Sequence, residues 1–227
     1  MRAPLSVVIP TLNAGSDTAA TVASLYEGLE NGMLRDLVIS DGGSDDGIQT
    51  LAEDLGARFV TGPASRGGQL IRGADIADGV WYLFLHADTV LEPGWTTAVG
   101  EHFSKHPDKA GYFRLAFRAD GFSPWIVALW ANARSHLFGL PYGDQGLLIS
   151  RTLYRDCGGF PDSPLMEDVA IARKLKGKLR QLNATARTGA EKYQAEGWFW
   201  RGAKNMWTLA RYFLGESPET LSEQYRK

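Results

Sequence analysis

The 227-residue sequence contains a single cysteine, Cys157, so no disulfide bond can form within the chain. It also lacks a long apolar run, because Val80–Leu85 is far shorter than the roughly 20 residues that cross a bilayer. The first apolar run, Leu5–Ile9, ends at Pro10 and is too short for the core of a secretory signal. We therefore expect a protein of a reducing, cytoplasmic compartment without a membrane-spanning segment.

The sequence also lacks a large excess of either positive or negative charge. The 24 Lys and Arg residues nearly balance 26 Asp and Glu residues, which gives a formal net charge of −2. Dedicated nucleic-acid-binding proteins usually carry a basic face and a high pI, so we expect no nucleic-acid partner. Hydrophobic residues at 44% and charged residues at 22% are typical of folded domains and exclude a disordered chain.

Three ligand-binding motifs are missing. The first predicted strand is followed by Pro10-Thr-Leu-Asn13 rather than G-x-G-x-x-G, and there is no Walker A lysine. A dinucleotide dehydrogenase and a P-loop NTPase are therefore disfavoured. The loop Asp41–Gly47 is acidic, but Asp46 stands where an EF-hand needs glycine and Ala52 where it needs glutamate.

Short apolar runs alternate with amphipathic stretches in the first ninety residues. Strands are predicted at Leu5–Ile9, Leu37–Ser40, Arg58–Thr61 and Val80–Leu85. Helices are predicted at Ser16–Leu29, Ile48–Leu55 and Gln69–Ala77, the first of them capped by Ser16 or Asp17. This alternation indicates an α/β fold with a mostly parallel central sheet flanked by helices.

The second half of the chain is less regular. Strands are predicted at Gly111–Phe117 and Gly146–Ser150, and a helix at Leu165–Leu175. The segment Trp198–Leu214 is amphipathic, aromatic and basic. Because neither a repeat nor a linker interrupts the chain, we expect one domain over residues 1–227, of which 191–227 form a helical extension.

Polar residues follow three of the predicted strands, at Thr11, Asp41 and Asp88. Ligands of parallel sheets bind beyond the carboxyl ends of the strands, where Asp41 can accept hydrogen bonds from a base or ribose. Asp88 suits Mg²⁺ or Mn²⁺ held jointly with substrate phosphates. His86 would share a face with Asp88 if the strand continued. The structural alternative for the loop that begins at Asp41 is a solvated turn that caps the next helix. The structural alternative for His86 and Asp88 is a structural histidine beside an acid whose hydrogen bonds are satisfied at the strand end.

Two further motifs stand at predicted helix starts. In Arg66-Gly-Gly-Gln69 the glycines allow close backbone approach and Arg66 can clamp a phosphate or a base, although such glycines are also common in turns. Carboxylates such as Glu167 and Asp168 are favoured in a first helical turn by the helix dipole alone. The same field keeps a carboxylate ionised, as a general base requires, and spacing does not separate the two acids.

The order of these motifs resembles the family 2 glycosyltransferases of GT-A fold. The resemblance is carried by Ser6–Asn13, Val38–Gly47, Arg66–Leu70, Phe84–Thr89 and Glu167–Asp168, and it runs from Leu5 to Tyr225. A smaller subgroup, the radical-SAM/selenodomain-associated glycosyltransferases, is similar at Pro141–Gln145, Gly158–Pro161 and Leu165–Asp168. The family implies inverting transfer of a sugar from a nucleoside-diphosphate sugar, with UDP the usual nucleotide, to a hydroxyl acceptor, assisted by Mn²⁺ or Mg²⁺.

The resemblance also implies roles for individual residues. The donor would be bound by Pro10, Thr11, Asn13, Asp41, Arg66, Gln69, His86, Ala87 and Asp88, within a nucleotide-binding half of residues 1–90. The acceptor and catalytic half, residues 91–190, would supply the base Asp168, its neighbour Glu167, and a sugar-bordering group of Tyr142, Asp144 and Gln145. Asp88 matches the last acid of the D-x-D metal motif. His86 stands in place of the first acid, as the second candidate ligand, and Gly42 in place of the second acid of the D-D-G-S loop.

The tryptophans admit several interpretations. We expect Trp125, Trp130, Trp198, Trp200 and Trp207 in the core or at a subunit interface, as in a homodimer, rather than as sugar platforms. Trp198–Leu214 could also lie on the inner surface of a membrane, which would suit a lipid-linked acceptor as well as a small molecule.

Two rival functions remain. A sugar-1-phosphate nucleotidyltransferase is disfavoured because Pro10–Asn13 is not a glycine-rich basic loop. A non-catalytic nucleotide-sugar-binding protein with a degenerate site is favoured by His86 alone.

Overall fold

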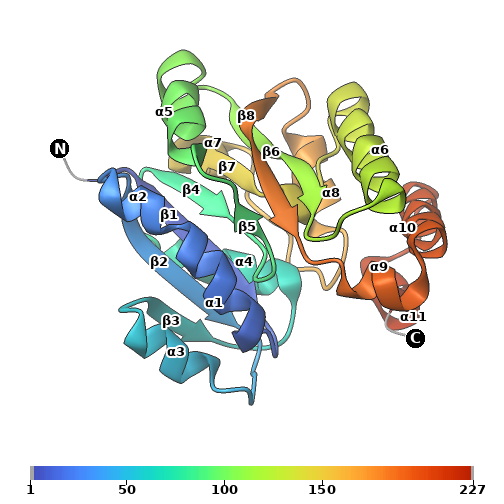
Figure 1. Ribbon diagram of the computed structural model, residues 1–227, viewed down its shortest axis with the longest axis horizontal. Coiled ribbons are helices and arrows are strands. Elements are labelled where there is room, and N and C mark those ends of the chain that lie inside the picture. The colour runs from blue at the N-terminus through green and yellow to red at the C-terminus, as the bar shows by residue number, and fades with distance from the viewer. Residues whose placement is uncertain (1–2, 226–227) are drawn as a thin grey trace.

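The computed structural model describes residues 3–225, so residues 1, 2, 226 and 227 of the expected domain lie outside the described part. Its centre is one eight-stranded sheet in the order β3-β2-β1-β4-β7-β6-β8-β5 (Figure 1). Strands β1 to β4 are mutually parallel, and β6 runs parallel to β8. Strand β7 is antiparallel to both of its neighbours, and β5 is antiparallel to β8. The predicted α/β architecture with a mostly parallel sheet is confirmed.

The strands are β1 (Leu5–Thr11), β2 (Leu34–Asp41), β3 (Arg58–Thr61), β4 (Trp81–Phe84), β5 (Val90–Leu91), β6 (Ala110–Phe117), β7 (Leu147–Ser150) and β8 (Leu179–Thr188). The helices of the first half are α1 (Gly15–Ser24), α2 (Tyr26–Glu30), α3 (Ile48–Asp54), α4 (Arg66–Ile76) and α5 (Trp95–Lys105). Those of the second half are α6 (Phe122–Phe138), the 3₁₀ turn η1 (Gly143–Gln145), α7 (Arg151–Asp156), α8 (Glu167–Lys174), α9 (Glu191–Glu196), α10 (Trp198–Phe213) and α11 (Pro218–Tyr225).

Apolar side chains cover both faces of the sheet. On one face Leu5, Val7 and Ile9 of β1 pack with residues of α5, including the fully buried Trp95. On the other face Val8 packs with residues of α4, α7 and α8. Burial on both faces explains why the β1 sequence is continuously apolar instead of alternating.

The first predicted helix differs from the structure in two ways. Residues Ser16–Leu29 form two helices, α1 and α2, which meet at Leu25. Neither Ser16 nor Asp17 is the N-cap, which is Ala14. Instead the Gly15 N–H donates to Asp46 Oδ2 at 2.7 Å, so an acid from the loop after β2 satisfies the helix start.

Five tryptophans were expected in the core or at an interface, and the core interpretation is right only for Trp198. Its ring stacks on Tyr193, with 5.1 Å between the centroids. The others lie on the surface, with 58% of Trp125, 51% of Trp130, 74% of Trp200 and 63% of Trp207 exposed. They lie on α6 and α10, whose buried positions are occupied mainly by small or polar residues.

No helix within residues 3–225 is both long enough and apolar enough to span a bilayer. The site is positioned by the carboxyl ends of β1, β2 and β4, by η1, and by the first turn of α8.

Candidate active site

Asp41 ends β2 and is only 2% exposed. Its carboxylate accepts hydrogen bonds from the backbone N–H groups of Gly43 and Ser44, both at 2.7 Å. It also accepts from the hydroxyls of Ser44 at 2.5 Å and Thr11 at 2.9 Å. Burial alone would raise the pKa of Asp41, but these four bonds outweigh it and the pKa lies below its usual value. In this structure the carboxylate organises the loop that follows it.

Asn13 links the loops after β1 and β2. Its backbone has a positive φ of 51°, a conformation that asparagine tolerates better than most residues. The Asn13 N–H donates to Ser44 Oγ at 2.8 Å, and its side-chain oxygen accepts from the Asp45 N–H at 3.1 Å. The two loops are therefore held to each other by hydrogen bonds of Asn13.

Gln69 on α4 is buried and supports the same edge. Its Nε2 donates to the carbonyls of Thr11 at 2.6 Å and Ser40 at 3.2 Å, which joins the ends of β1 and β2. A Cβ atom on Gly42 would lie 3.2 Å from the Gln69 amide. This crowding gives a physical reason for glycine at the position where the motif usually has a second acid.

A hollow opens beside Asp41 and is lined by Gly43, Ser44, Phe59 and Thr61, among others. Phe59 and Thr61 belong to β3, and Thr61 pairs in register with Asp41. Sequence reasoning missed Phe59 as a candidate nucleobase neighbour. The sequence did contain a signal for Phe59, because the third predicted strand, which contains it, must end beside the second. Of the remaining predicted donor residues, Pro10 lies in β1 beside Ser40, and Ala87 is buried with its carbonyl accepting from Thr21.

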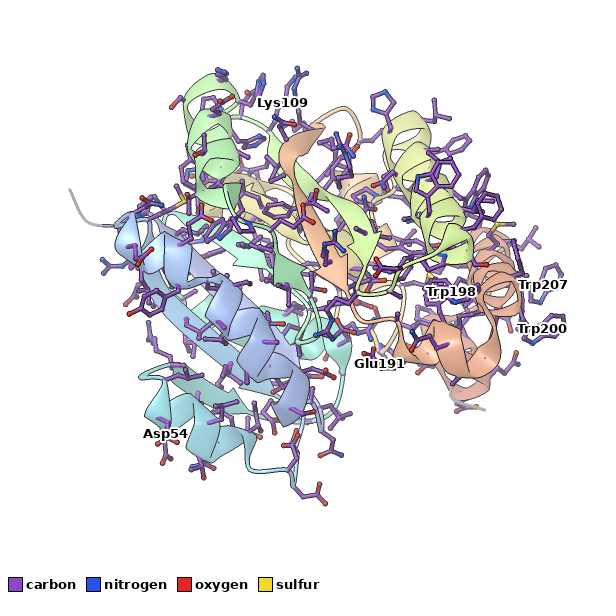
Figure 2. All side chains as sticks on the ribbon, viewed as in Figure 1. Asp54, Lys109, Glu191, Trp198, Trp200 and Trp207 are labelled. Atoms are coloured by element: carbon purple, nitrogen blue, oxygen red, sulfur yellow. The ribbon has the colours of Figure 1, made fainter. Side chains whose placement is uncertain are left out.

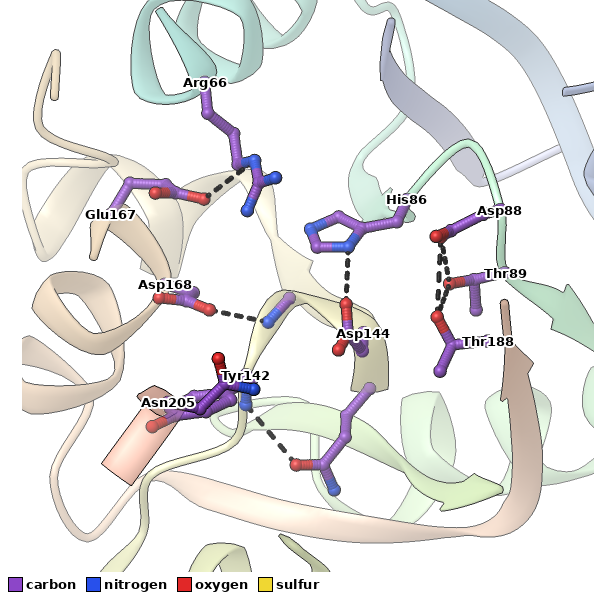
Figure 3. A network of polar contacts seen from close by, with 12 residues as sticks. Arg66, His86, Asp88, Thr89, Tyr142, Asp144, Glu167, Asp168, Thr188 and Asn205 are labelled. Carbon is purple, nitrogen blue, oxygen red and sulfur yellow. Dashed lines mark hydrogen bonds and ion pairs between the residues drawn. The ribbon is translucent and has the colours of Figure 1, made fainter. Parts of the chain in front are cut away.

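Asp168 lies in the first turn of α8, as the sequence predicts. Its Oδ2 accepts from the Gly143 N–H of η1 at 2.8 Å, and its Oδ1 accepts from the Val169 N–H at 2.7 Å (Figure 3). The side chain borders a second hollow, which His86, Tyr142 and several apolar residues also line. The Asp168 carboxylate is therefore half-buried at the edge of this hollow and is held in one orientation by two backbone donors.

Glu167 points away from solvent and is 1% exposed. Its Oε1 is 3.7 Å from Arg66 Nε, whereas its Oε2 has no hydrogen-bond partner among residues 3–225. Burial, and then the neighbouring charge of Asp168, raise the pKa of Glu167 to about 7 even though Arg66 opposes the shift. Asp168 and Glu167 are thus distinguished by their environments, which the spacing could not do.

The Glu167→Gln variant should be more stable than the parent chain at pH 8, by on the order of 2–3 kcal/mol. The raised pKa means that the folded chain binds this proton more tightly than the unfolded chain. The stability that protonation contributes is present below the ordinary value of 4.5 and is lost as the pH rises through about 7. The melting temperatures of the two proteins should therefore separate as the pH rises from 4 to 8, with the Glu167→Gln variant melting at the higher temperature. Parallel curves for the two proteins would contradict the assignment.

His86 and Asp144 form a pair, with Nδ1 and Oδ1 2.8 Å apart (Figure 3). Burial lowers the pKa of His86, but the hydrogen bond to Asp144 and the negative charges of Asp144 and Asp88 together outweigh it, and the pKa lies above its ordinary value. The other ring nitrogen, Nε2, packs against η1, where a Cβ atom on Gly143 would come within 2.2 Å of it. In this structure both His86 nitrogens therefore face η1.

The strand does not continue to His86 and Asp88, so the condition under which they would share one face is not met. Strand β4 ends at Phe84, and the chain turns at Ala87 and Asp88. The Asp88 carboxylate lies instead near the hydroxyls of Thr89 at 3.3 Å and Thr188 at 3.4 Å.

The donor set around Asp88 fits only one mode of metal binding. Across residues 3–225, no three His, Cys, Asp or Glu side chains converge on a common point. A dedicated protein cage is therefore excluded for the described chain. The single half-exposed carboxylate of Asp88 suits a Mg²⁺ or Mn²⁺ ion that takes its other ligands from substrate phosphates and water. His86 does not complete such a set in this conformation, because its Nδ1 is paired with Asp144 and its Nε2 packs against Gly143.

The predicted sugar-bordering group divides into two. Tyr142 lines the hollow beside Asp168, and its ring lies beneath the Arg134 guanidinium, 3.4 Å from Arg134 Cζ. Gln145 is fully buried, accepts from Ser135 Oγ at 2.5 Å and donates to the Phe113 carbonyl at 3.1 Å. Gln145 therefore anchors η1 to α6 and β6 and does not line the hollow.

Polar loops at the carboxyl edge of a mostly parallel sheet, with an acid in the first turn of α8, define a GT-A fold of the glycosyltransferase type. The chain belongs to the Glycosyl transferase family 2, whose family model matches residues 6–160, more than half of the sequence. Asp41, Arg66 and Asp88 lie inside the matched segment. Glu167 and Asp168 lie beyond it.

Two curated relatives carry the name PGL/p-HBAD biosynthesis glycosyltransferase. One is from Mycobacterium bovis (strain BCG / Pasteur 1173P2) and one from Mycobacterium tuberculosis (strain ATCC 25177 / H37Ra). Each is 33% identical to this chain over 135 residues, which cover 54% of this chain and 51% of the relative. The match thus spans about half the length of these relatives.

Solved structures share the fold at low identity. S. aureus TarS 1-349 in complex with UDP-GlcNAc has a TM-score of 0.61 at 15% identity, covering 82% of this chain and 58% of that chain. Glucosyl-3-phosphoglycerate synthase from Mycobacterium tuberculosis in complex with Mn²⁺, UDP and glucosyl-3-phosphoglycerate has a TM-score of 0.57 at 20% identity. That match covers 82% of this chain and 70% of the other.

Proposed function

We propose that this chain transfers a sugar from a nucleoside-diphosphate sugar, with UDP as the nucleotide, to an acceptor hydroxyl with inversion at the anomeric carbon. The observation that carries the proposal is Asp168, held by the Gly143 N–H at the edge of a hollow that His86 and Tyr142 also line. Residues 1–90 would bind the donor and residues 91–190 would supply the base and the acceptor site, within one domain.

The reaction follows from this placement. Asp168 accepts the proton of the acceptor hydroxyl as the oxygen forms a bond to the anomeric carbon. The bond between that carbon and the diphosphate oxygen breaks, and the diphosphate leaves with the electron pair. The two backbone donors hold the Asp168 carboxylate in one orientation. General-base catalysis needs a carboxylate oxygen within about 3 Å of the acceptor hydroxyl.

The leaving group is negatively charged and needs positive partners. Arg66 opens α4, and its side chain is 42% exposed, so it can reach a diphosphate while paired with Glu167. A divalent ion, when bound at Asp88, would neutralise negative charge on the diphosphate. UDP is favoured because the structural neighbours named above were solved with UDP-GlcNAc or with UDP, and Mn²⁺ because the glucosyl-3-phosphoglycerate synthase complex contains it.

The donor assignment can be tested by thermal unfolding with UDP, GDP and CDP, each with and without Mn²⁺. A ligand at about 100 times its Kd stabilises by about 2.7 kcal/mol, which for this size is a rise of roughly 5–10 °C. We expect that rise for UDP with Mn²⁺ only. The Asp88→Asn variant should keep the melting temperature of the free protein and lose the Mn²⁺-dependent part of the rise. A larger rise with GDP or CDP would overturn the UDP assignment.

A second candidate function is nucleotide-sugar binding without turnover. The observation that favours it is the His86–Asp144 pair, which occupies the side chain standing in place of the first metal-binding acid. Slow release of free UDP from a UDP-sugar in the presence of Mn²⁺ is expected of a transferase. Stable binding with no release would support the binding protein instead.

The acceptor is proposed only as a hydroxyl compound, either a small molecule or one linked to a lipid. The motif Pro141–Gln145 further supports placement in the radical-SAM/selenodomain-associated subgroup. The lone Cys157 supports a reducing, cytoplasmic location, and a place at the inner face of a membrane belongs with the lipid-linked alternative.

A further inference from the structure

Helices α6 and α10 lie side by side at one end of the molecule and expose apolar residues to solvent (Figure 1). The exposed large side chains of α6 are Phe122, Trp125, Leu129, Trp130, Leu137 and Phe138. Those of α10 and its end are Phe199, Trp200, Met206, Trp207, Phe213 and Leu214. We call these residues the aromatic face. Figure 2 shows Trp200 and Trp207 projecting away from the body of the protein.

Both helices differ from ordinary surface helices, because their charged side chains are buried or partly buried while large apolar ones are exposed. Arg201 of α10 is 5% exposed and donates to Glu196 and to Tyr225 Oη, each at 2.6 Å. Arg134 of α6 is 8% exposed and covers the Tyr142 ring. Along these two fully described helices, no exposed position carries Asp, Glu, Lys or Arg. An apolar area of this extent marks a contact with something other than water.

We propose that the aromatic face seats the protein on a lipid bilayer, at the boundary between headgroups and acyl chains. Aromatic and aliphatic residues along one side of a helix are the pattern of helices that lie in this boundary. A second protein copy would be expected to meet a polar rim and about one hydrogen bond per 100–200 Å² of interface. The aromatic face offers few polar groups for such bonds.

The basic residues of α10 are engaged within the chain. Arg211 bonds to Glu216 and to Gln224, and Lys204 Nζ lies 3.4 Å from the Tyr225 carbonyl. Binding should therefore depend on apolar insertion more than on anionic lipid, and it should persist at high salt.

The inner sides of the same helices border the candidate site. Arg134 of α6 covers the ring of Tyr142, which lines the hollow beside Asp168. Leu209 and Tyr212 of α10 pack in one cluster with Tyr142. The functional consequence of this proximity rests on the proposed function. A membrane lipid would present its acceptor hydroxyl near Asp168.

The test is flotation of the full chain with vesicles of pure phosphatidylcholine and of phosphatidylcholine with a quarter phosphatidylglycerol, at 0.1 M and about 0.5 M salt. We expect flotation with both, with little change at high salt. The double variant Trp200→Asp/Trp207→Asp should bind vesicles at least about tenfold more weakly. The matched control Tyr26→Asp/Leu29→Asp changes two exposed apolar residues on α2 and should bind as the parent does.

Melting temperature and the UDP response are measured for all three proteins, so that loss of folding or of donor binding is separated from loss of lipid binding. Flotation that the Trp200 and Trp207 changes leave intact would overturn the proposal. A second outcome would also overturn it: the parent chain does not float, is a dimer by light scattering, and becomes a monomer when Trp200 and Trp207 are changed. The readout does not require turnover, so it stands apart from failure of the proposed reaction.

Discussion

Replacement of Asp168 by Asn should lower kcat by a factor of about 10²–10⁴, the usual contribution of a positioned general base. The amide has nearly the shape of the carboxylate but only one acceptor oxygen, which can keep the bond from the Gly143 N–H while the bond from the Val169 N–H is lost. The fold and the nucleotide site should remain, because Val169 follows Asp168 directly in the chain and Asp168 is not assigned to the donor. Steady-state rates with a UDP-sugar and an active acceptor provide the measurement.

Two comparisons make this result interpretable. The melting-temperature rise with UDP and Mn²⁺ should match that of the parent, because Asp168 is not assigned to the donor. The matched variant Asp156→Asn removes an exposed carboxylate at the end of α7 and should leave kcat unchanged. If Asp168→Asn retained more than about a tenth of the parent rate, the base would have to be another group, with Asp144 the first to examine.

Replacement of Gly67 by Ala should destabilise the protein by about 2–3 kcal/mol and lower its melting temperature by roughly 5–10 °C. A Cβ atom at this position would lie 2.0 Å from the Pro161 carbonyl oxygen and 2.8 Å from the Ser163 nitrogen. Both are backbone atoms and cannot turn aside as a flexible side chain would. The Gly67 N–H also donates to the Ser163 carbonyl at 3.0 Å, so the start of α4 is fastened to this loop.

The matched control is Gly100→Ala on α5, where the nearest atom to the new Cβ would be Met33 Cε at 3.8 Å. Alanine is favoured over glycine inside a helix by up to about 1 kcal/mol, so this variant should melt at the same or a higher temperature. Because Gly67 adjoins Arg66, the Gly67 change should also weaken the response to UDP. An unchanged melting temperature would show that residues 161–163 move aside at little cost.

Much of the first half was predictable from the sequence because its signals are local. The run Leu5–Ile9 is continuously apolar, and both faces of β1 are buried, so periodicity and burial agree. The acids Asp41 and Glu167 stand where a strand ends and a helix begins, and these ends were close to correct. By contrast β8 was missed, because its sequence is polar and only Leu182, Ala186 and Thr188 are buried along it.

Local sequence patterns were enough to predict the α/β architecture, the sheet edge that carries the polar loops and the acids available for chemistry, since each depends on apolar periodicity and turn residues within a short window. The packing of distant segments then determines which of these groups meet. His86 pairs with Asp144 across 58 positions, Asp88 approaches Thr188 across 100, and Asp46 satisfies the start of α1. This packing also leaves Trp125, Trp130, Trp200 and Trp207 exposed, because the inner sides of α6 and α10 hold Arg134 and Arg201. Such contacts depend on the packing of distant segments, which no local pattern encodes.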